Sequence, residues 1–312
     1  MKKQTIGIFV IVLILATLFT IKSFGFVSGQ EIRSKKEILQ NEPVITYSPE
    51  YFENMKKGSA STKVINPRIT KYQEYISHVN NGKKIVPVVM YHYIENFVDP
   101  HDTTKQKLNV MAPVFEYQLL AWKRSGYNTL FAKDLENILN DDHYIHGRDV
   151  VLTFDDGYED FYTIVFPLLK KYKMKGTVYV ISNFVGRYGF LKKEQLVEMS
   201  KSGLVEIGGH TQNHAYLKGL KNEYVLTEVI DGKSDIEKII GSKIVTFAYP
   251  FGAYSEDAEK AVEKSGYKIA FTTMPGIAHS PQEKLLLPRI RPFQINYQNI
   301  DASLAQIYSQ YK

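Results

Sequence analysis

The most constraining feature of the sequence is the alternation of short apolar segments with amphipathic ones between residues 85 and 273. Runs such as "DVVLTF", "GTVYVIS" and "KIAFTT" have the composition of buried strands. The segments between them, such as "NEYVLTEVIDGKSDIEKIIG", have apolar residues at helical spacing. Strands that alternate with helices form parallel βαβ units, so the pattern predicts a barrel or a doubly wound sheet. In both architectures the functional side chains follow the carboxyl ends of the strands.

The polar residues at the predicted strand ends form a short set. They are His92 after "VPVVMY", Asp155 and Asp156 after "VLTF", His210 and His214 after "VEIGG", the turn "AYPFG" after "VTF", and Arg289 and Arg291 in "LPRIRP".

The aspartate pair and the two histidines have the composition of a metal site. Adjacent carboxylates at the end of a buried strand repel each other unless a cation or a proton separates their roles. Histidines four residues apart, as in "HTQNH", lie on one face if the segment turns helically. Two imidazoles and one carboxylate with open positions are typical of a hydrolytic zinc site. The alternatives are an Asp-Gly turn and a surface loop with two unrelated histidines.

Taken together, "TFDDG", "HTQNH" and "FAYPFG" resemble the motifs of the polysaccharide deacetylases of carbohydrate esterase family 4, the NodB-homology domain. The resemblance extends over roughly residues 85–291. It implies a distorted, incomplete (β/α) barrel and metal-dependent removal of acetyl groups from N-acetylated sugars. It also implies that Asp155 is the general base and that Asp156, His210 and His214 are the metal ligands.

The sequence departs from the family pattern in two motifs. The third motif, Arg-x-Pro-Tyr in the family, reads "AYPF" here; the backbone N–H of Phe251 can still donate to an oxyanion, since that role needs no particular side chain. The arginine that orients the base is missing there, so we expect Arg289 or Arg291 to supply its charge.

The family's late Leu-x-His, the general acid, is also missing. Similarity to the circularly permuted biofilm poly-N-acetylglucosamine deacetylases places His92 in that role, with His279 in "GIAHSP" as the alternative.

The resemblance therefore predicts a metal-dependent hydrolase that removes N-acetyl groups from an extracellular N-acetylglucosamine polymer. The expected substrate is poly-β-1,6-N-acetylglucosamine, with peptidoglycan or chitooligosaccharides as the alternative. A catalytically silent sugar-binding protein of the cell surface is the alternative outside the enzymes. The expected cofactor is a divalent metal, zinc before nickel, cobalt or iron.

The N-terminal segment predicts export. Lys2 and Lys3 precede an uncharged apolar run from Thr5 to Ile21, which with its apolar flank is just long enough to span a bilayer. We expect a signal anchor at residues 1–27, a polar stalk at 28–84 and a deacetylase domain at 85–312, in a single-pass membrane protein whose catalytic domain is extracellular. A cleaved signal peptide and a secreted protein are the alternative.

Composition excludes several other functions. The chain has no cysteine, which rules out disulfides, thiol nucleophiles and cysteine-ligated metals. Its net charge of +6 is spread along the chain, and no basic run alternates with aromatic residues as nucleic-acid binding would require. The expected partners are an N-acetylated polysaccharide and the membrane, and protein partners are not predicted.

Overall fold

The computed structural model of the chain describes residues 85–140, 148–279 and 283–311. The predicted anchor at 1–27 and stalk at 28–84 lie outside these ranges. Within them, no helix combines the length and the apolar character needed to cross a membrane.

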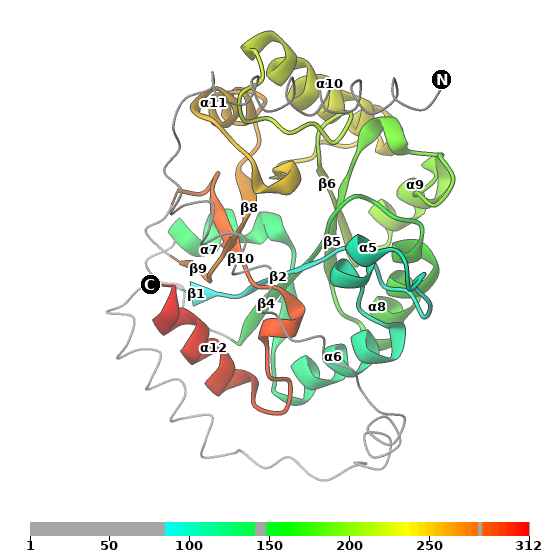
Figure 1. Cartoon of the computed structure of the whole chain (residues 1–312), viewed down its shortest axis with the longest axis vertical. Helices are drawn as coiled ribbons and strands as arrows, with labels where there is room; N and C mark the ends of the chain where they lie inside the picture. The colour runs from blue at the N-terminus through cyan, green and yellow to red at the C-terminus, as the bar shows by residue number, and fades with distance from the viewer. Residues whose placement is uncertain (1–84, 141–147, 280–282, 312) are drawn as a thin grey trace, which may run out of the picture. The chain divides into compact units, whose positions relative to one another are not determined.

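The described chain alternates strands and helices in the predicted order (Figure 1). The strands are β1 (Ile85–Val86), β2 (Val88–Tyr91), β3 (Asn128–Leu130), β4 (Asp149–Phe154), β5 (Gly176–Val180), β6 (Val205–Gly209), β7 (Thr246–Ala248), β8 (Ile269–Pro275), β9 (Ala278–His279) and β10 (Leu287–Arg289). The α-helices are α5 (Thr103–Leu108), α6 (Ala112–Arg124), α7 (Leu135–Asn140), α8 (Phe166–Tyr172), α9 (Lys193–Lys201), α10 (Asn222–Ile240), α11 (Glu256–Lys264) and α12 (Ile300–Gln310). The short turns are η2 (Ala132–Asp134), the π-helical η3 (Phe161–Val165), η4 (Ser182–Phe184), η5 (Pro250–Gly252) and η6 (Pro292–Gln294).

The main sheet is parallel and nearly closes on itself. Its strand order is β10-β8-β7-β6-β5-β4-β2, and β3 pairs with β4 outside this path. The two ends of this order meet, because Met90 N–H donates to the carbonyl of Ile290 at 2.8 Å and Ile290 N–H donates to the carbonyl of Val88 at 2.8 Å. The first and last strands of the ring are therefore neighbours, and the fold is the predicted β/α barrel.

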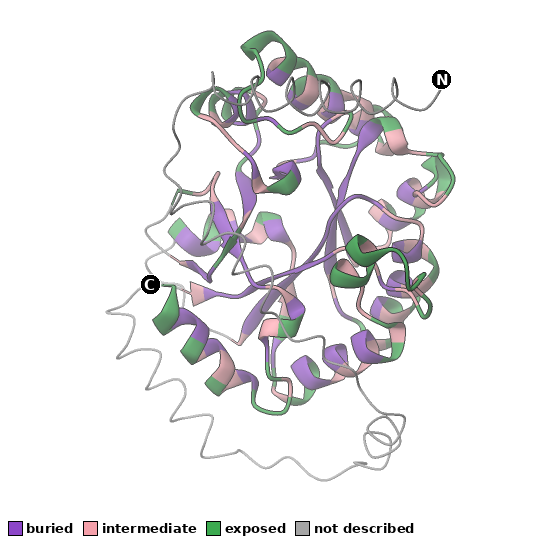
Figure 2. Ribbon diagram, viewed as in Figure 1, coloured by how far each residue is buried: buried purple, intermediate pink, exposed green. Residues whose placement is uncertain are grey.

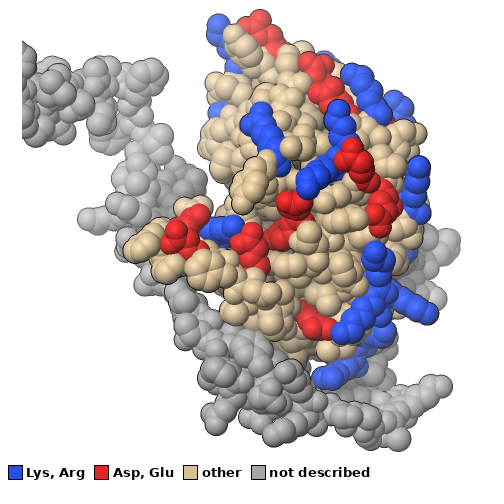
Figure 3. Space-filling view, turned by 90° about the vertical axis from the view of Figure 1, so that its right-hand side faces the viewer, with Lys and Arg blue, Asp and Glu red and all other residues tan. Residues whose placement is uncertain are grey.

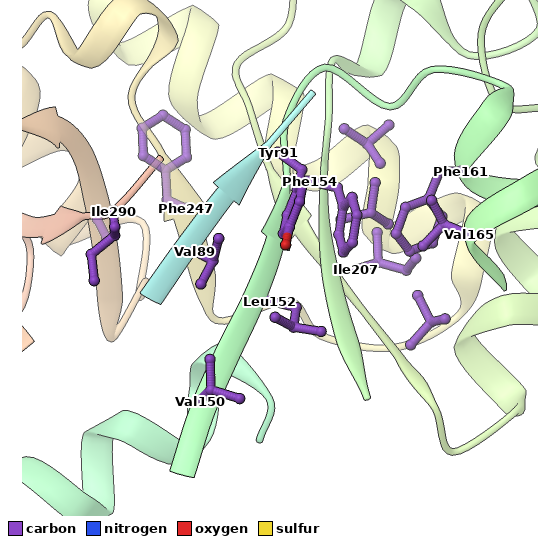
Figure 4. Packing of buried hydrophobic residues seen from close by; sticks show 14 of the residues in the cluster. Val89, Tyr91, Val150, Leu152, Phe154, Phe161, Val165, Ile207, Phe247 and Ile290 are labelled. Carbon is purple, nitrogen blue, oxygen red and sulfur yellow. The ribbon is translucent and has the colours of Figure 1, made fainter. Parts of the chain in front are cut away.

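The two faces of each strand bury different side chains. On β4, Val150, Leu152 and Phe154 belong to the larger hydrophobic cluster, which packs under the helices that surround the strands (Figures 1 and 4). Val151 points the other way, into a smaller cluster with side chains from β2, β5, β7, β8 and β10. Because side chains alternate along a strand, Asp155 lies on the same inward face as Val151.

Burial follows this layering (Figure 2). Most strand residues are buried, and many exposed residues lie on the outer sides of the helices. On the face drawn in Figure 3, basic and acidic side chains are interspersed. Charges of both signs on that face favour solubility.

Candidate active site

Asp155 is held at the barrel mouth by a buried arginine from the last strand. Nη1 and Nη2 of Arg289 donate to its two carboxylate oxygens, each at 2.7 Å. Arg289 also donates through Nε to the carbonyl of Thr272 at 3.0 Å and through Nη1 to Thr153 Oγ1 at 3.2 Å. Burial alone would raise the pKa of Asp155, but Arg289 outweighs it and the pKa is lowered, so this carboxylate is ionised at neutral pH.

The structure separates the two arginines that the sequence left as alternatives. Arg289 ends β10 and has a side-chain exposure of 0%, whereas Arg291 lies beyond the strand and precedes η6. The guanidinium of Arg291 lies over the ring of Phe293, 6.0 Å from its centroid. Of the two arginines, Arg289 is therefore the one whose guanidinium contacts Asp155.

Asp156, His210 and His214 converge on one point. Asp156 Oδ1 lies 3.2 Å from Nε2 of His210 and 3.2 Å from Nε2 of His214. One ligand atom from each residue lies within 4.8 Å of the others, as in a metal site.

The hydrogen bonds around this cluster fit a divalent cation. Nδ1 of His210 lies 2.6 Å from the carbonyl of Ala248, which can only accept, so Nδ1 carries the proton and Nε2 is left to bind a metal. Asp156 Oδ1 is buried and has no hydrogen-bond donor among the described residues. A buried carboxylate oxygen normally accepts a hydrogen bond. Together with the two imidazole nitrogens that it faces, this oxygen has the composition of a metal-ligand set.

The segment that carries the two histidines is not helical. Residues 210–217 form an irregular loop in which Thr211 and His214 have positive φ values, 63° and 60°. The expectation that a helical turn aligns the histidines is therefore wrong. Two left-handed residues reverse the chain and bring His214 back beside His210.

Helix α10 supports this loop, which sequence reasoning did not anticipate. Oε2 of Glu228 accepts from the backbone N–H groups of Gln212 at 3.1 Å and Asn213 at 2.8 Å. A Cβ on Gly232 would lie 2.8 Å from the backbone of Thr211, so only glycine allows this close approach. A glycine within a predicted helix was the one sequence signal of that contact.

His92 lies beside Asp155 because of the register between β2 and β4. Tyr91 pairs with Phe154, so the next residues of the two strands, His92 and Asp155, also come together. His92 Nε2 is 3.9 Å from Asp155 Oδ2. Burial lowers the pKa of His92, although Asp155 and Asp156 act in the opposite direction. His92 also lines a pocket with residues of the segment 107–110 and with Arg291.

The alternative histidine lies elsewhere in the barrel. His279 pairs with Ile85, at the start of the first strand segment, whereas His92 follows its end. The structure thus brings His92, and not His279, to Asp155.

Phe251 borders the cluster from the turn after β7. Its ring centroid is 4.5 Å from that of His214, so the side chain of Phe251 lies next to a candidate ligand. The arrangement therefore combines a possible metal site, an ionised carboxylate and an imidazole, which are groups that metal-assisted hydrolysis uses.

Known proteins are similar to this chain in sequence. A family model described as polysaccharide deacetylase matches residues 144–270. The chain is 34% identical over 206 residues to YxkH of Bacillus subtilis, provisionally named a polysaccharide deacetylase; the match covers 66% of this chain and 71% of YxkH. It is 25% identical over 240 residues to the poly-beta-1,6-N-acetyl-D-glucosamine N-deacetylase of Staphylococcus aureus, covering 72% and 81% of the two chains.

Two solved structures have a similar fold. The deacetylase PplD of Streptococcus pyogenes, in complex with acetate, superposes with a TM-score of 0.64 at 32% identity, over 72% of this chain and 97% of PplD. IcaB from Ammonifex degensii superposes with a TM-score of 0.62 at 25% identity, over 72% of this chain and 97% of IcaB. The sequence, the barrel and these relatives lead to one conclusion: the chain belongs to the polysaccharide deacetylases, the NodB-homology group of carbohydrate esterase family 4, and is a hydrolase that acts on amides.

Proposed function

We propose that the protein removes N-acetyl groups from an extracellular N-acetylglucosamine polymer with the help of a divalent metal, and that poly-β-1,6-N-acetylglucosamine is its substrate. The observation that carries the proposal is the convergence of Asp156, His210 and His214 next to Asp155, which Arg289 keeps ionised. The substrate is supported by the names of the staphylococcal relatives and by the early position of His92.

Zinc is the proposed metal, because two imidazoles and one carboxylate suit it and leave positions open for water and substrate. Bound to Asp156, His210 and His214, it would polarise the acetyl carbonyl and lower the pKa of a water molecule.

The chain's own residues would move the protons. Asp155 accepts a proton from the attacking water, a role for which its lowered pKa and fixed orientation suit it. The backbone N–H of Phe251 donates to the oxyanion. His92, whose pKa burial lowers, accepts the proton that Asp155 took from the water and donates it to the departing amine.

Peptidoglycan is the second candidate substrate, since its N-acetylglucosamine presents the same acetamido group. The catalytically silent alternative is disfavoured, because the base and all three candidate ligands are present and gathered in one place. We further propose that residues 1–27 anchor the protein in the membrane, that 28–84 form a stalk, and that the domain from residue 85 acts outside the cell.

The test measures acetate release and bound metal together. The full-length protein and its variants are incubated with poly-β-1,6-N-acetylglucosamine, chitin oligomers and peptidoglycan. Asp155→Asn and His92→Asn should lose most turnover and keep metal, whereas His214→Ala should lose metal; His279→Gln, a histidine remote from the cluster, is the control. Full activity of Asp155→Asn would refute the mechanism, and acetate release from peptidoglycan alone would refute the substrate.

A further inference from the structure

Two exposed aromatic residues lie beside the candidate metal ligand His214. Phe251 is 60% exposed and Tyr216 is 54% exposed. The ring centroid of Phe251 is 4.5 Å from that of His214, and the centroid of Tyr216 is 6.0 Å from that of Phe251. These two rings, which we call the aromatic platform (Tyr216 and Phe251), form a surface that leads outward from the cluster.

The turn holds Phe251 in this exposed position against its backbone preference. Phe251 has φ of 59°, a left-handed value that is unfavourable for a bulky side chain. The carbonyl of Phe251 accepts from Thr273 Oγ1 at 3.2 Å, and Gly252 N–H donates to the carbonyl of Tyr249 at 2.8 Å. A Cβ on Gly252 would overlap Thr273, so the turn lies tightly against β8.

An exposed aromatic ring on a strained backbone combines two unfavourable features. Strained residues persist where the surrounding structure over-determines them, and they cluster at active sites and ligand clamps. Burying Phe251 would favour folding, yet the ring stays in solvent next to a candidate ligand. Both features therefore point to a ligand that covers the ring.

We infer that the aromatic platform is a subsite for a sugar ring of the glycan, adjacent to the residue whose acetamido group reaches the metal cluster. This inference rests on the proposed function. A pyranose ring presents C–H groups on its faces, and an aromatic ring offers a large rigid surface for such contact at low cost in conformational entropy. Because the reacting sugar is covalently part of a chain, its neighbour has to lie against a surface that borders the ligands, and the platform is such a surface. The occupant is thus a neutral sugar of the same polymer.

Binding can be measured separately from turnover. The full-length Asp155→Asn protein, with its metal content verified, is titrated calorimetrically with an N-acetylated β-1,6-glucosamine hexasaccharide. Tyr216→Ala, Tyr216→Phe and Tyr188→Ala are then introduced into this background. Tyr188 is the matched control, because it is fully exposed and its substitution also removes one tyrosine ring.

Tyr216→Ala should weaken hexasaccharide binding about two- to tenfold, the range for loss of one aromatic contact, while Tyr216→Phe and Tyr188→Ala retain the affinity. Equal affinity of Tyr216→Ala and Tyr188→Ala would overturn the inference, as would a hexasaccharide that does not bind. A change in oligomeric state of Tyr216→Ala with unchanged affinity would assign the platform to contact between copies and would also overturn it. Failure of the wild type to release acetate would count against the proposed function alone, because the affinities are measured without turnover.

Discussion

Replacing Arg289 by methionine should destabilise the fold strongly, because it leaves a buried carboxylate without its cation. Asp155 is 3% exposed, and Arg289 supplies both of its charged hydrogen bonds at 2.7 Å. Breaking a buried ion pair by removing one partner costs about 3–5 kcal/mol. Arg289→Met and Asp155→Leu should each lower the free energy of unfolding by about that amount at pH 7. The double variant, which buries no unpaired charge, should be more stable than either single one.

The loss should depend on pH in a defined direction. In the wild type the lowered pKa of Asp155 contributes stability that is present above the unfolded pKa, about 3.9, and is lost as the pH falls through the folded pKa. Without Arg289, burial raises the pKa of the same carboxyl, so its charge then opposes folding above about pH 4. The difference between wild type and Arg289→Met should therefore be largest near pH 7 and shrink below about pH 4.

Urea unfolding of all four proteins, in chelator so that metal binding does not contribute, measures these differences. If the free energy of unfolding of Arg289→Met lies within about 1 kcal/mol of the wild-type value at pH 7, the reasoning is contradicted. A buried carboxylate that loses its cation should destabilise the fold by more than that. A double variant as unstable as the sum of the single ones would do the same, since it would show that the two side chains are not coupled.

Further substitutions test other parts of the domain. Gly232→Ala should lower metal affinity, because its Cβ would collide with the loop at Thr211. Gly241→Ala, at the C-cap of the same helix, should cost stability through its positive φ and leave metal affinity unchanged; metal titration compares the two. Burial raises the pKa of Asp160 to about 6, so its contribution to stability is lost as the pH rises through that value. Relative to Asp160→Asn, the wild type should lose about 2–3 kcal/mol between pH 4 and pH 7, and parallel pH profiles of urea unfolding would contradict this. Phe251→Gly should raise the free energy of unfolding by about 1 kcal/mol through relief of its left-handed strain while it weakens hexasaccharide binding; a less stable variant would show that the ring contributes to packing.

The barrel and most of the site could be predicted from the hydrophobic periodicity of the sequence and from the polar residues that follow the predicted strands. The apolar run before Asp155 predicted a buried strand, and the polar residues after such strands proved to be neighbours because parallel strands present their carboxyl ends at one edge. His92 could be placed only through a resemblance, since nothing local distinguishes it from other histidines. Its proximity to Asp155 depends on the pairing of β2 with β4, a long-range register.

Other features were not predictable from local sequence. Arg289 and Arg291 are two residues apart and would share a face of a continuous strand, but β10 ends at Arg289 and the chain then turns into η6. The loop geometry of Thr211 and His214 also escaped prediction, because left-handed φ values at residues other than glycine have a weak local signal. Glu228 supports that loop from a distant helix, and no spacing rule connects the two.

The pairing of the first and last barrel strands also determines when, during synthesis, the ion pair of the active site can form. Asp155 and its counter-charge are separated by 134 positions, and the strand that carries Arg289 is the last to be made. Until that strand is made, the carboxylate at the end of β4 lacks its cation, in a chain that already holds every candidate metal ligand. Domains are made from the N-terminus onward, so the candidate metal ligands are all in the chain before the residue that keeps the base ionised.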